Sequence, residues 1–161
     1  MDGSPVTDWR HDNSGRLLFD STRRFQEGVL AIVNGAGYPD IRIAHLAVTR
    51  HIELAGTRIA DAAQRAGVTK QSMGEMIDQL QAMGFVARQP DPRDRRAKIV
   101  VFTHAGRKLL SVIRDAVESC EQDMRARIGD RALRQLRTTL SAYCRADAEA
   151  AQPPARSRRR T

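Results

Sequence analysis

The sequence predicts a mainly α-helical protein with one small β-hairpin, in a chain of 161 residues that suits a single compact domain. First, 41% of the residues are hydrophobic but only 4% are aromatic, so aliphatic side chains must build the core, and such a composition favours helices. Second, apolar residues recur at helical spacing in several stretches. Third, Gln89 to Thr103 (QPDPRDRRAKIVVFT) places a charged tip between short apolar runs, as a hairpin does.

The first third of the chain predicts two helices after a disordered start. Residues 1–13 are polar and show little periodicity, so we expect them to be disordered. Apolar residues at helical spacing then run from Ser14 to Gly35, where glycine predicts a helix stop. Asp40 is placed to cap a second helix, from Ile41 to Glu53.

Residues 56–85 (GTRIADAAQRAGVTKQSMGEMIDQLQAMGF) predict a helix-turn-helix. A short apolar face ends at Gly67, and Thr69 can then cap a second amphipathic helix that Gly84 closes. Because the charged hairpin follows at once, residues 41–103 have the order of a winged helix-turn-helix. In that arrangement the second helix fits the major groove of DNA, and an arginine-tipped hairpin can enter the minor groove.

Two more helices follow, and together with the first helix they predict a dimer. Thr103 can cap a helix that runs through Arg127, Gly129 breaks it, and Asp130 can cap the last helix. Residues 14–35 and 104–148 offer more apolar helical face than a small winged domain needs, which implies a partner surface. We therefore expect one domain over residues 14–150 with dimerisation helices at both ends, and a basic disordered tail at 151–161.

Charge and cysteine content narrow the partner and the compartment. A formal net charge of +8 and a sequence pI of about 10.6 favour a polyanion such as nucleic acid, or an anionic membrane surface. No stretch approaches the roughly 18 consecutive apolar residues of a membrane span, and the first residues do not resemble a signal peptide. The two cysteines, Cys120 and Cys144, are too few for a disulfide scaffold, so we expect a cytoplasmic protein.

The second helix of the helix-turn-helix carries the residues expected to read DNA. Lys70 can contact guanine or phosphate, Gln71 suits adenine, and Ser72 suits either kind of base. Gly74 costs about 1 kcal/mol relative to alanine inside a helix, which indicates either close approach of the backbone to DNA or close helix packing. The full predicted set on this helix is Thr69, Lys70, Gln71, Ser72, Gly74 and Glu75.

The hairpin and the helix-turn-helix together resemble the MarR family of bacterial regulators. DPRDRRAKIVVFTHAGR resembles that family's wing and following helix start, and RIADAAQRAGVTKQSMGEMIDQLQAMGFVARQPDP is similar to its helix-turn-helix and strand. The resemblance runs from about Leu46 to Leu110. By position it implies that Asp94 orients a wing arginine, that Arg95 or Arg96 reaches into the minor groove, and that Arg93 meets the DNA backbone. The wing set is Arg93, Asp94, Arg95, Arg96 and Lys98.

Glu75 departs from the family pattern, in which a polar or basic residue is common at this place. A carboxylate repels phosphate, so Glu75 must accept a hydrogen bond from cytosine, pair with Lys70 or Arg65, or point away from DNA.

The resemblance also implies an obligate homodimer and a small, often aromatic or anionic, effector. Its pocket would lie between the dimer helices and the DNA-binding lobe, and the candidate lining residues are Phe25, Tyr38, His45 and His51. We expect a sequence-specific regulator, a repressor, that binds a near-palindromic operator as a homodimer.

Three other functions compete with this interpretation. A redox-responsive regulator would use Cys120 or Cys144, although both lie on apolar helix faces, where cysteine behaves as a small hydrophobe. A sequence-indifferent architectural protein would explain the arginine tail, but not the polar set that can read bases. An enzyme is not expected, because the sequence has no nucleophile motif and no phosphate-binding loop. The four histidines also lack metal-ligand spacing, so no cofactor and no metal are expected.

Overall fold

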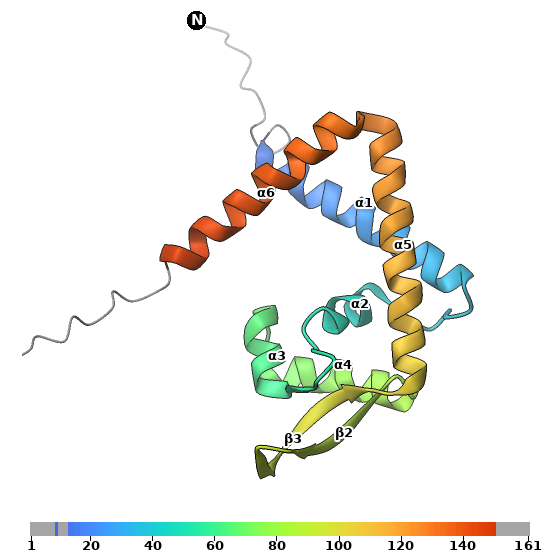
Figure 1. The fold of residues 1–161 in the computed structure, drawn as a ribbon, viewed down its shortest axis with the longest axis vertical. Helices are drawn as coiled ribbons and strands as arrows, with labels where there is room; N and C mark the ends of the chain where they lie inside the picture. The colour runs from blue at the N-terminus through green and yellow to red at the C-terminus, as the bar shows by residue number, and fades with distance from the viewer. Residues whose placement is uncertain (1–8, 10–12, 151–161) are drawn as a thin grey trace, which may run out of the picture. The chain divides into compact units, whose positions relative to one another are not determined.

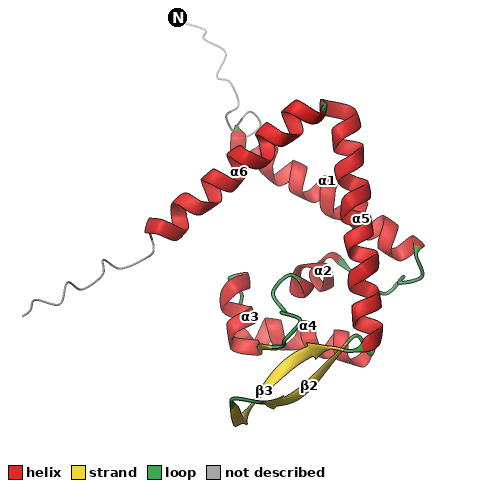
Figure 2. Ribbon diagram, in the orientation of Figure 1, coloured by secondary structure: helices red, strands yellow, loops and turns green. Residues whose placement is uncertain are grey.

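The computed structural model describes Trp9 and residues 13–150, so the predicted disorder of residues 1–13 and 151–161 falls almost entirely outside the described residues. Contacts divide the chain into two compact units, residues 1–120 and 121–161, and each unit is treated by itself. The fold is mostly helical with one small antiparallel sheet, as the sequence predicts (Figures 1 and 2). No helix within the described residues is long and apolar enough to cross a membrane.

Two helices open the first unit. Helix α1 spans Ser14–Gly35, as the sequence predicts, and the side chain of Asn13 caps it by accepting from the N–H of Arg16. Helix α2 spans only Ile43–Thr49, so the predicted range and the predicted cap at Asp40 are wrong. The N-cap residue is Arg42, and its backbone N–H donates to Nδ1 of His45 at 3.2 Å. The imidazole of His45 therefore accepts a hydrogen bond from the backbone at the start of this helix, where a carboxylate was predicted.

The helix-turn-helix has the predicted form. Helix α3 spans Ile59–Ala66 and ends at Gly67, whose left-handed backbone (φ 65°) leads the chain into the turn. Helix α4 spans Lys70–Ala82 and is capped by Thr69, whose Oγ1 accepts from the N–H of Ser72 at 3.1 Å.

A three-stranded sheet follows the helix-turn-helix and includes a strand that the sequence analysis did not predict. Strands β2 (Val86–Asp91) and β3 (Asp94–Phe102) form the predicted hairpin, in register from Val86 opposite Phe102. Strand β1 (Thr57–Arg58) lies on the other side of β3, with Arg58 opposite Ile99. Two residues between helices leave no alternating pattern to detect, which explains the omission. The hairpin projects past α4, and its tip lies beyond the helices of this unit (Figure 1).

One face of α4 is buried in the core of the first unit. Met73, Ile77 and Leu80 are fully buried there and share one helical stripe. They belong to a hydrophobic cluster to which every helix of this unit and strands β2 and β3 contribute. Besides these three it contains Val29, Val33, Ile41, Leu46, Val48, Ile52, Ala62, Ala63, Val86, Val100, Phe102, Leu109 and Ala116. The side of α4 away from this cluster is thereby left to face outward.

Helix α5 spans His104–Ile128 and begins against the sheet. Oγ1 of Thr103 accepts from the N–H of Gly106 at 3.0 Å, which confirms the predicted cap. A Cβ at Gly106 would lie 1.9 Å from the backbone oxygen of Phe85, so only glycine permits this contact between helix and strand. The start of α5 is therefore fixed against the first residue before β2.

The second unit contains the end of α5 and helix α6 (Asp130–Ala150), separated by Gly129 with φ 82°. Asp130 is the first residue of α6 and not its cap, and its carboxylate pairs with Arg125 at 2.7 Å. Leu136 and Tyr143 on α6 are exposed in the single chain.

Candidate nucleic-acid interface

The first turn of α4 presents the predicted base-reading residues to solvent. Thr69, Lys70, Gln71, Ser72 and Glu75 are all exposed, because the opposite stripe of the helix is committed to the core. Oγ1 of Thr69 also lies 2.9 Å from Oγ of Ser72, so the two hydroxyls form a hydrogen bond beside the start of α4. The partial positive charge of a helix N-terminus at this place suits a phosphate.

Gly74 has no packing role within the described part of the chain. A Cβ built at Gly74 would meet no atom within 4 Å, leaving aside the backbone of its own helix. Close helix packing, one of the two explanations for a glycine at this position, is thus wrong. Close approach of the α4 backbone to DNA, the other explanation, stays a prediction.

Glu75 is held by its neighbour on the same helix. Its Oε1 accepts from Nε2 of Gln71 at 3.1 Å, one helical turn earlier. Arg65, a predicted partner of Glu75, instead pairs with Glu53 at 2.6 Å. Because a carboxylate can only accept hydrogen bonds, the amide NH2 of Gln71, and not its carbonyl, faces Glu75. The Gln71 carbonyl and its second N–H stay available, and these are the two groups that adenine requires.

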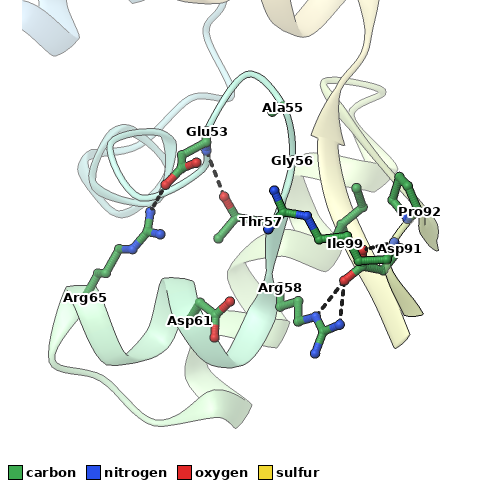
Figure 3. Close-up of a pocket in the computed structure, with 11 residues that line it drawn as sticks. Glu53, Ala55, Gly56, Thr57, Arg58, Asp61, Arg65, Asp91, Pro92 and Ile99 are labelled. Carbon is green, nitrogen blue, oxygen red and sulfur yellow. Dashed lines mark hydrogen bonds and ion pairs between the residues drawn. The ribbon is translucent and has the colours of Figure 1, made fainter. Parts of the chain in front are cut away.

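The tip of the hairpin is organised by Asp91, which the sequence analysis did not select. Asp91 is only 6% exposed, and its Oδ1 accepts from the backbone N–H of Arg93 at 2.9 Å. Its Oδ2 accepts from Nε of Arg58 at 2.7 Å and lies 2.6 Å from Nη2 of the same residue (Figure 3). The N–H of Arg93 and the guanidinium of Arg58 hold the pKa of the Asp91 carboxyl below its usual value, and Asp91 in turn raises the pKa of Arg58.

Asp94 contacts the backbone of one wing arginine and the side chain of an arginine outside the wing. Its Oδ1 accepts from the backbone N–H of Arg96 at 3.1 Å, and its Oδ2 lies 3.5 Å from Nη2 of Arg58. Arg58 precedes α3 and lies outside the wing, and the role of Asp94 in orienting a wing arginine stays a prediction. Arg93, Arg96 and Lys98 are exposed, and Arg95 lies on β3 with a side chain outside the described part.

A second ion pair ties the hairpin to α4. Nη1 of Arg88, on β2, lies 2.7 Å from Oδ1 of Asp78 on α4. The hairpin is therefore joined to α4 through Arg88, while its tip is joined to the residue before α3 through Arg58.

The four predicted effector-lining residues have different surroundings, and their role stays a prediction. His45 is buried, and its Nε2 lies 2.8 Å from Oε1 of Gln79 on α4, so both ring nitrogens serve the fold. Tyr38 stacks at a tilt on Phe85, with ring centroids 5.7 Å apart, and Phe25 packs against the core. His51 is half-buried. A cavity of about 550 Å³ lies between the loop before β1, helix α3 and the hairpin tip, where Arg58, Asp61, Arg65 and Asp91 line it (Figure 3).

The chemistry of the described residues offers no metal site: no group of three or more His, Cys, Asp or Glu among them is placed to hold an ion. Cys120 is half-buried, Cys144 is exposed, and both are thiols.

Residues 40–97, the helix-turn-helix and most of the hairpin, match the sequence profile of the MarR family. CouR from Rhodococcus jostii RHA1, solved with p-coumaroyl-CoA, is similar over 82% of this chain and 92% of its own, with 27% identity and a TM-score of 0.64. The helix-turn-helix and hairpin of this chain thus resemble those of the MarR family. A transcriptional repressor CouR bound to a 23-mer DNA duplex shares the fold over 89% of this chain and 99% of its own, with 20% identity and a TM-score of 0.67.

A curated relative matches only part of the chain. The transcriptional activatory protein BadR of Rhodopseudomonas palustris is 33% identical over 67 residues, which are 42% of this chain. The match spans 38% of the length of BadR.

Proposed function

We propose that this chain is a sequence-specific DNA-binding transcriptional regulator of the MarR family that acts as a homodimer. The observation that carries the proposal is the outward face of α4, where Lys70, Gln71 and Ser72 are exposed beside a free helix start and a hairpin bearing arginines. Such a pair of elements reaches a major groove and the adjacent minor groove at once. The DNA-bound CouR supports the proposal at the level of the shared fold.

The roles of individual residues follow from their surroundings. Gln71, oriented by Glu75, reads adenine, and Lys70 reads guanine or contacts phosphate. Arg95 or Arg96 enters the minor groove, while Arg93 and Lys98 contact the DNA backbone. Gly74 allows the backbone of α4 to come close to a base edge, since no atom of the described residues outside its own helix lies within 4 Å of a Cβ built there.

The homodimer is supported by apolar side chains that the single chain leaves uncovered. Leu17 and Phe19 on α1 are 66% and 65% exposed, and Leu18 and Ile32 on the same helix are also exposed. Exposed apolar residues clustered on a helix indicate a protein interface. Two copies related by a two-fold axis would then place two α4 helices on half-sites about 10 bp apart or a multiple of that, which requires a near-palindromic operator.

Regulation by a small aromatic or anionic effector and repression are the finer parts of the proposal. CouR was solved with p-coumaroyl-CoA, which makes an effector of this kind a reasonable expectation for this chain. BadR is named as an activatory protein, so activation is the competing direction of control. A reporter driven by the promoter next to the gene decides between them: deleting the gene raises the output of a repressed promoter and lowers that of an activated one.

Footprinting on the DNA that flanks the gene tests the proposal as a whole. We expect a short protected segment of imperfect two-fold symmetry that persists as salt is raised to about 0.15 M. Protection that spreads evenly over all DNA and disappears with salt would favour the architectural protein instead.

A further inference from the structure

Helix α3 begins without a capping side chain of the kind preferred at a helix N-terminus. The residue at its N-cap is Arg58, and no side-chain hydrogen bond caps the helix. Ser, Thr, Asp and Asn are preferred at an N-cap because their oxygens accept from the free N–H groups of the first turn. A guanidinium has only donors, so Arg58 cannot do this. A place where a local rule is broken is where another role is expected.

The side chain of Arg58 reaches across to the tip of the hairpin instead. Its Nε and Nη2 both lie within 2.7 Å of Oδ2 of Asp91, and Nη2 lies 3.5 Å from Oδ2 of Asp94. Asp91 also receives the N–H of Arg93, so one guanidinium contacts the carboxylates at both ends of the tip turn. This bond is charge-assisted and one of its partners, Asp91, is nearly buried, which makes it stronger than an ordinary surface pair.

Backbone pairing alone does not hold the tip. Strand β1 pairs with β3 only at Val100 and Ile99, and the ladder between β2 and β3 becomes irregular between Pro90 and Asp91. A hairpin whose end extends past its partner strand opens readily unless side chains secure it. Arg58 belongs to β1 and continues the link from the helix-turn-helix outward to the tip.

We propose that Arg58 is a positioning residue that fixes the tip of the hairpin relative to the helix-turn-helix. The proposal rests on the proposed DNA-binding function and deepens it. A protein that reads two grooves at once gains affinity when the two readers are held at their bound separation before DNA arrives. Arg58, through Asp91, sets the separation between the arginines of the tip and the exposed face of α4.

Arg65, which lines the same 550 Å³ cavity as Arg58, offers a matched control for a substitution of Arg58. Arg65 lies on α3, and its guanidinium pairs with Glu53 on the wall opposite Arg58 (Figure 3). The two arginine side chains are similarly exposed, 41% for Arg58 and 48% for Arg65. Both carry one positive charge beside the same proposed DNA face, but Arg65 contacts the loop before β1 and not the hairpin.

The test compares Arg58→Thr with Arg65→Thr, both made in the full chain. Threonine at position 58 supplies the missing helix cap, so the thermal midpoint of Arg58→Thr should not fall. Hydrogen exchange of the amides of residues 88–98, measured without DNA, should become at least threefold faster in Arg58→Thr and stay unchanged in Arg65→Thr. Asp91→Asn keeps an acceptor for the N–H of Arg93 but loses the charge, and should speed exchange in the same region.

DNA affinity is then measured on a duplex selected from a random-sequence pool by the unaltered protein. We expect the dissociation constant to rise about fivefold to tenfold in Arg58→Thr, and no more than about twofold in Arg65→Thr, since each loses one charge. Combining Arg58→Thr with Asp91→Asn should cost no more than the larger single effect, because both break one contact.

Equal exchange rates at the tip in Arg58→Thr and Arg65→Thr would overturn the anchoring role, whatever the DNA results. Faster exchange accompanied by equal losses of affinity in the two variants would overturn the positioning role. If the unaltered protein selects no sequence at all, the proposed function fails, whereas the exchange measurement still decides whether Arg58 anchors the tip.

Discussion

Replacing Gly74 by alanine should make the protein more stable and its DNA complex weaker. Gly74 lies inside α4, and the added methyl group would meet no atom of the described chain within 4 Å beyond its own helix. The folded chain therefore gains the helix propensity of alanine without a steric cost. Any loss of DNA binding must then come from the methyl group itself meeting the DNA.

The size of both effects follows from these surroundings. Alanine is favoured over glycine inside a helix by about 1 kcal/mol, which should raise the thermal midpoint by about 3 °C in a chain of this length. On the DNA side, a methyl group that displaces the backbone from a base edge should cost about 1 to 3 kcal/mol, or roughly fivefold to 150-fold in the dissociation constant.

The assay pairs calorimetry of the free protein with binding to the selected duplex at fixed salt. Gly35→Ala is the control, because a methyl group there also meets nothing within 4 Å, at the end of α1. Gly35→Ala should leave affinity unchanged. A Gly74→Ala variant that is more stable and binds DNA as tightly as the unaltered protein would refute the inference of close backbone approach.

Three other predictions concern the dimer and the tip. Leu17→Asp combined with Phe19→Asp should yield a monomer in sedimentation experiments, because charges replace two exposed apolar side chains on α1; an unchanged dimer would place the interface elsewhere. Asp94→Ala should weaken operator binding although it removes a negative charge, since Asp94 accepts from the N–H of Arg96, and tighter binding would favour a generic basic patch. The pKa of the Asp91 carboxyl in the folded chain is lowered from its usual 3.8. The ionised carboxylate therefore stabilises the folded chain above about pH 4, and this stabilisation is lost as the pH falls through the folded pKa. The difference in unfolding free energy between the unaltered protein and Asp91→Asn should therefore narrow below about pH 4, and a constant difference would contradict the ion pair.

Elements with strong local signals could be predicted from the sequence, and elements set by long-range contacts could not. The bounds of α1 and the turn at Gly67 followed from periodicity and glycine placement. The start of α2 did not, because a histidine ring of the helix itself replaces the expected capping carboxylate. Strand β1 has two residues and exists only because β3 pairs with it.

The candidate site shows the same division. The exposed set at the start of α4 could be read from the apolar stripe on the opposite side of the helix. Arg58 and Asp91 are 33 positions apart, and only the folded chain brings their side chains together. One signal was present in the sequence, namely an arginine directly before Ile59, where a capping residue is preferred.

The ratio of two dissociation constants tests the central claim, that α4 and the hairpin read a DNA sequence, most directly. The first is measured on the selected duplex and the second on a duplex of the same composition in permuted order, both at about 0.15 M salt. A sequence-specific regulator should favour the selected duplex by about a thousandfold or more. A ratio near one, with both affinities falling equally as salt is raised, would contradict the account and assign the chain to sequence-indifferent DNA binding.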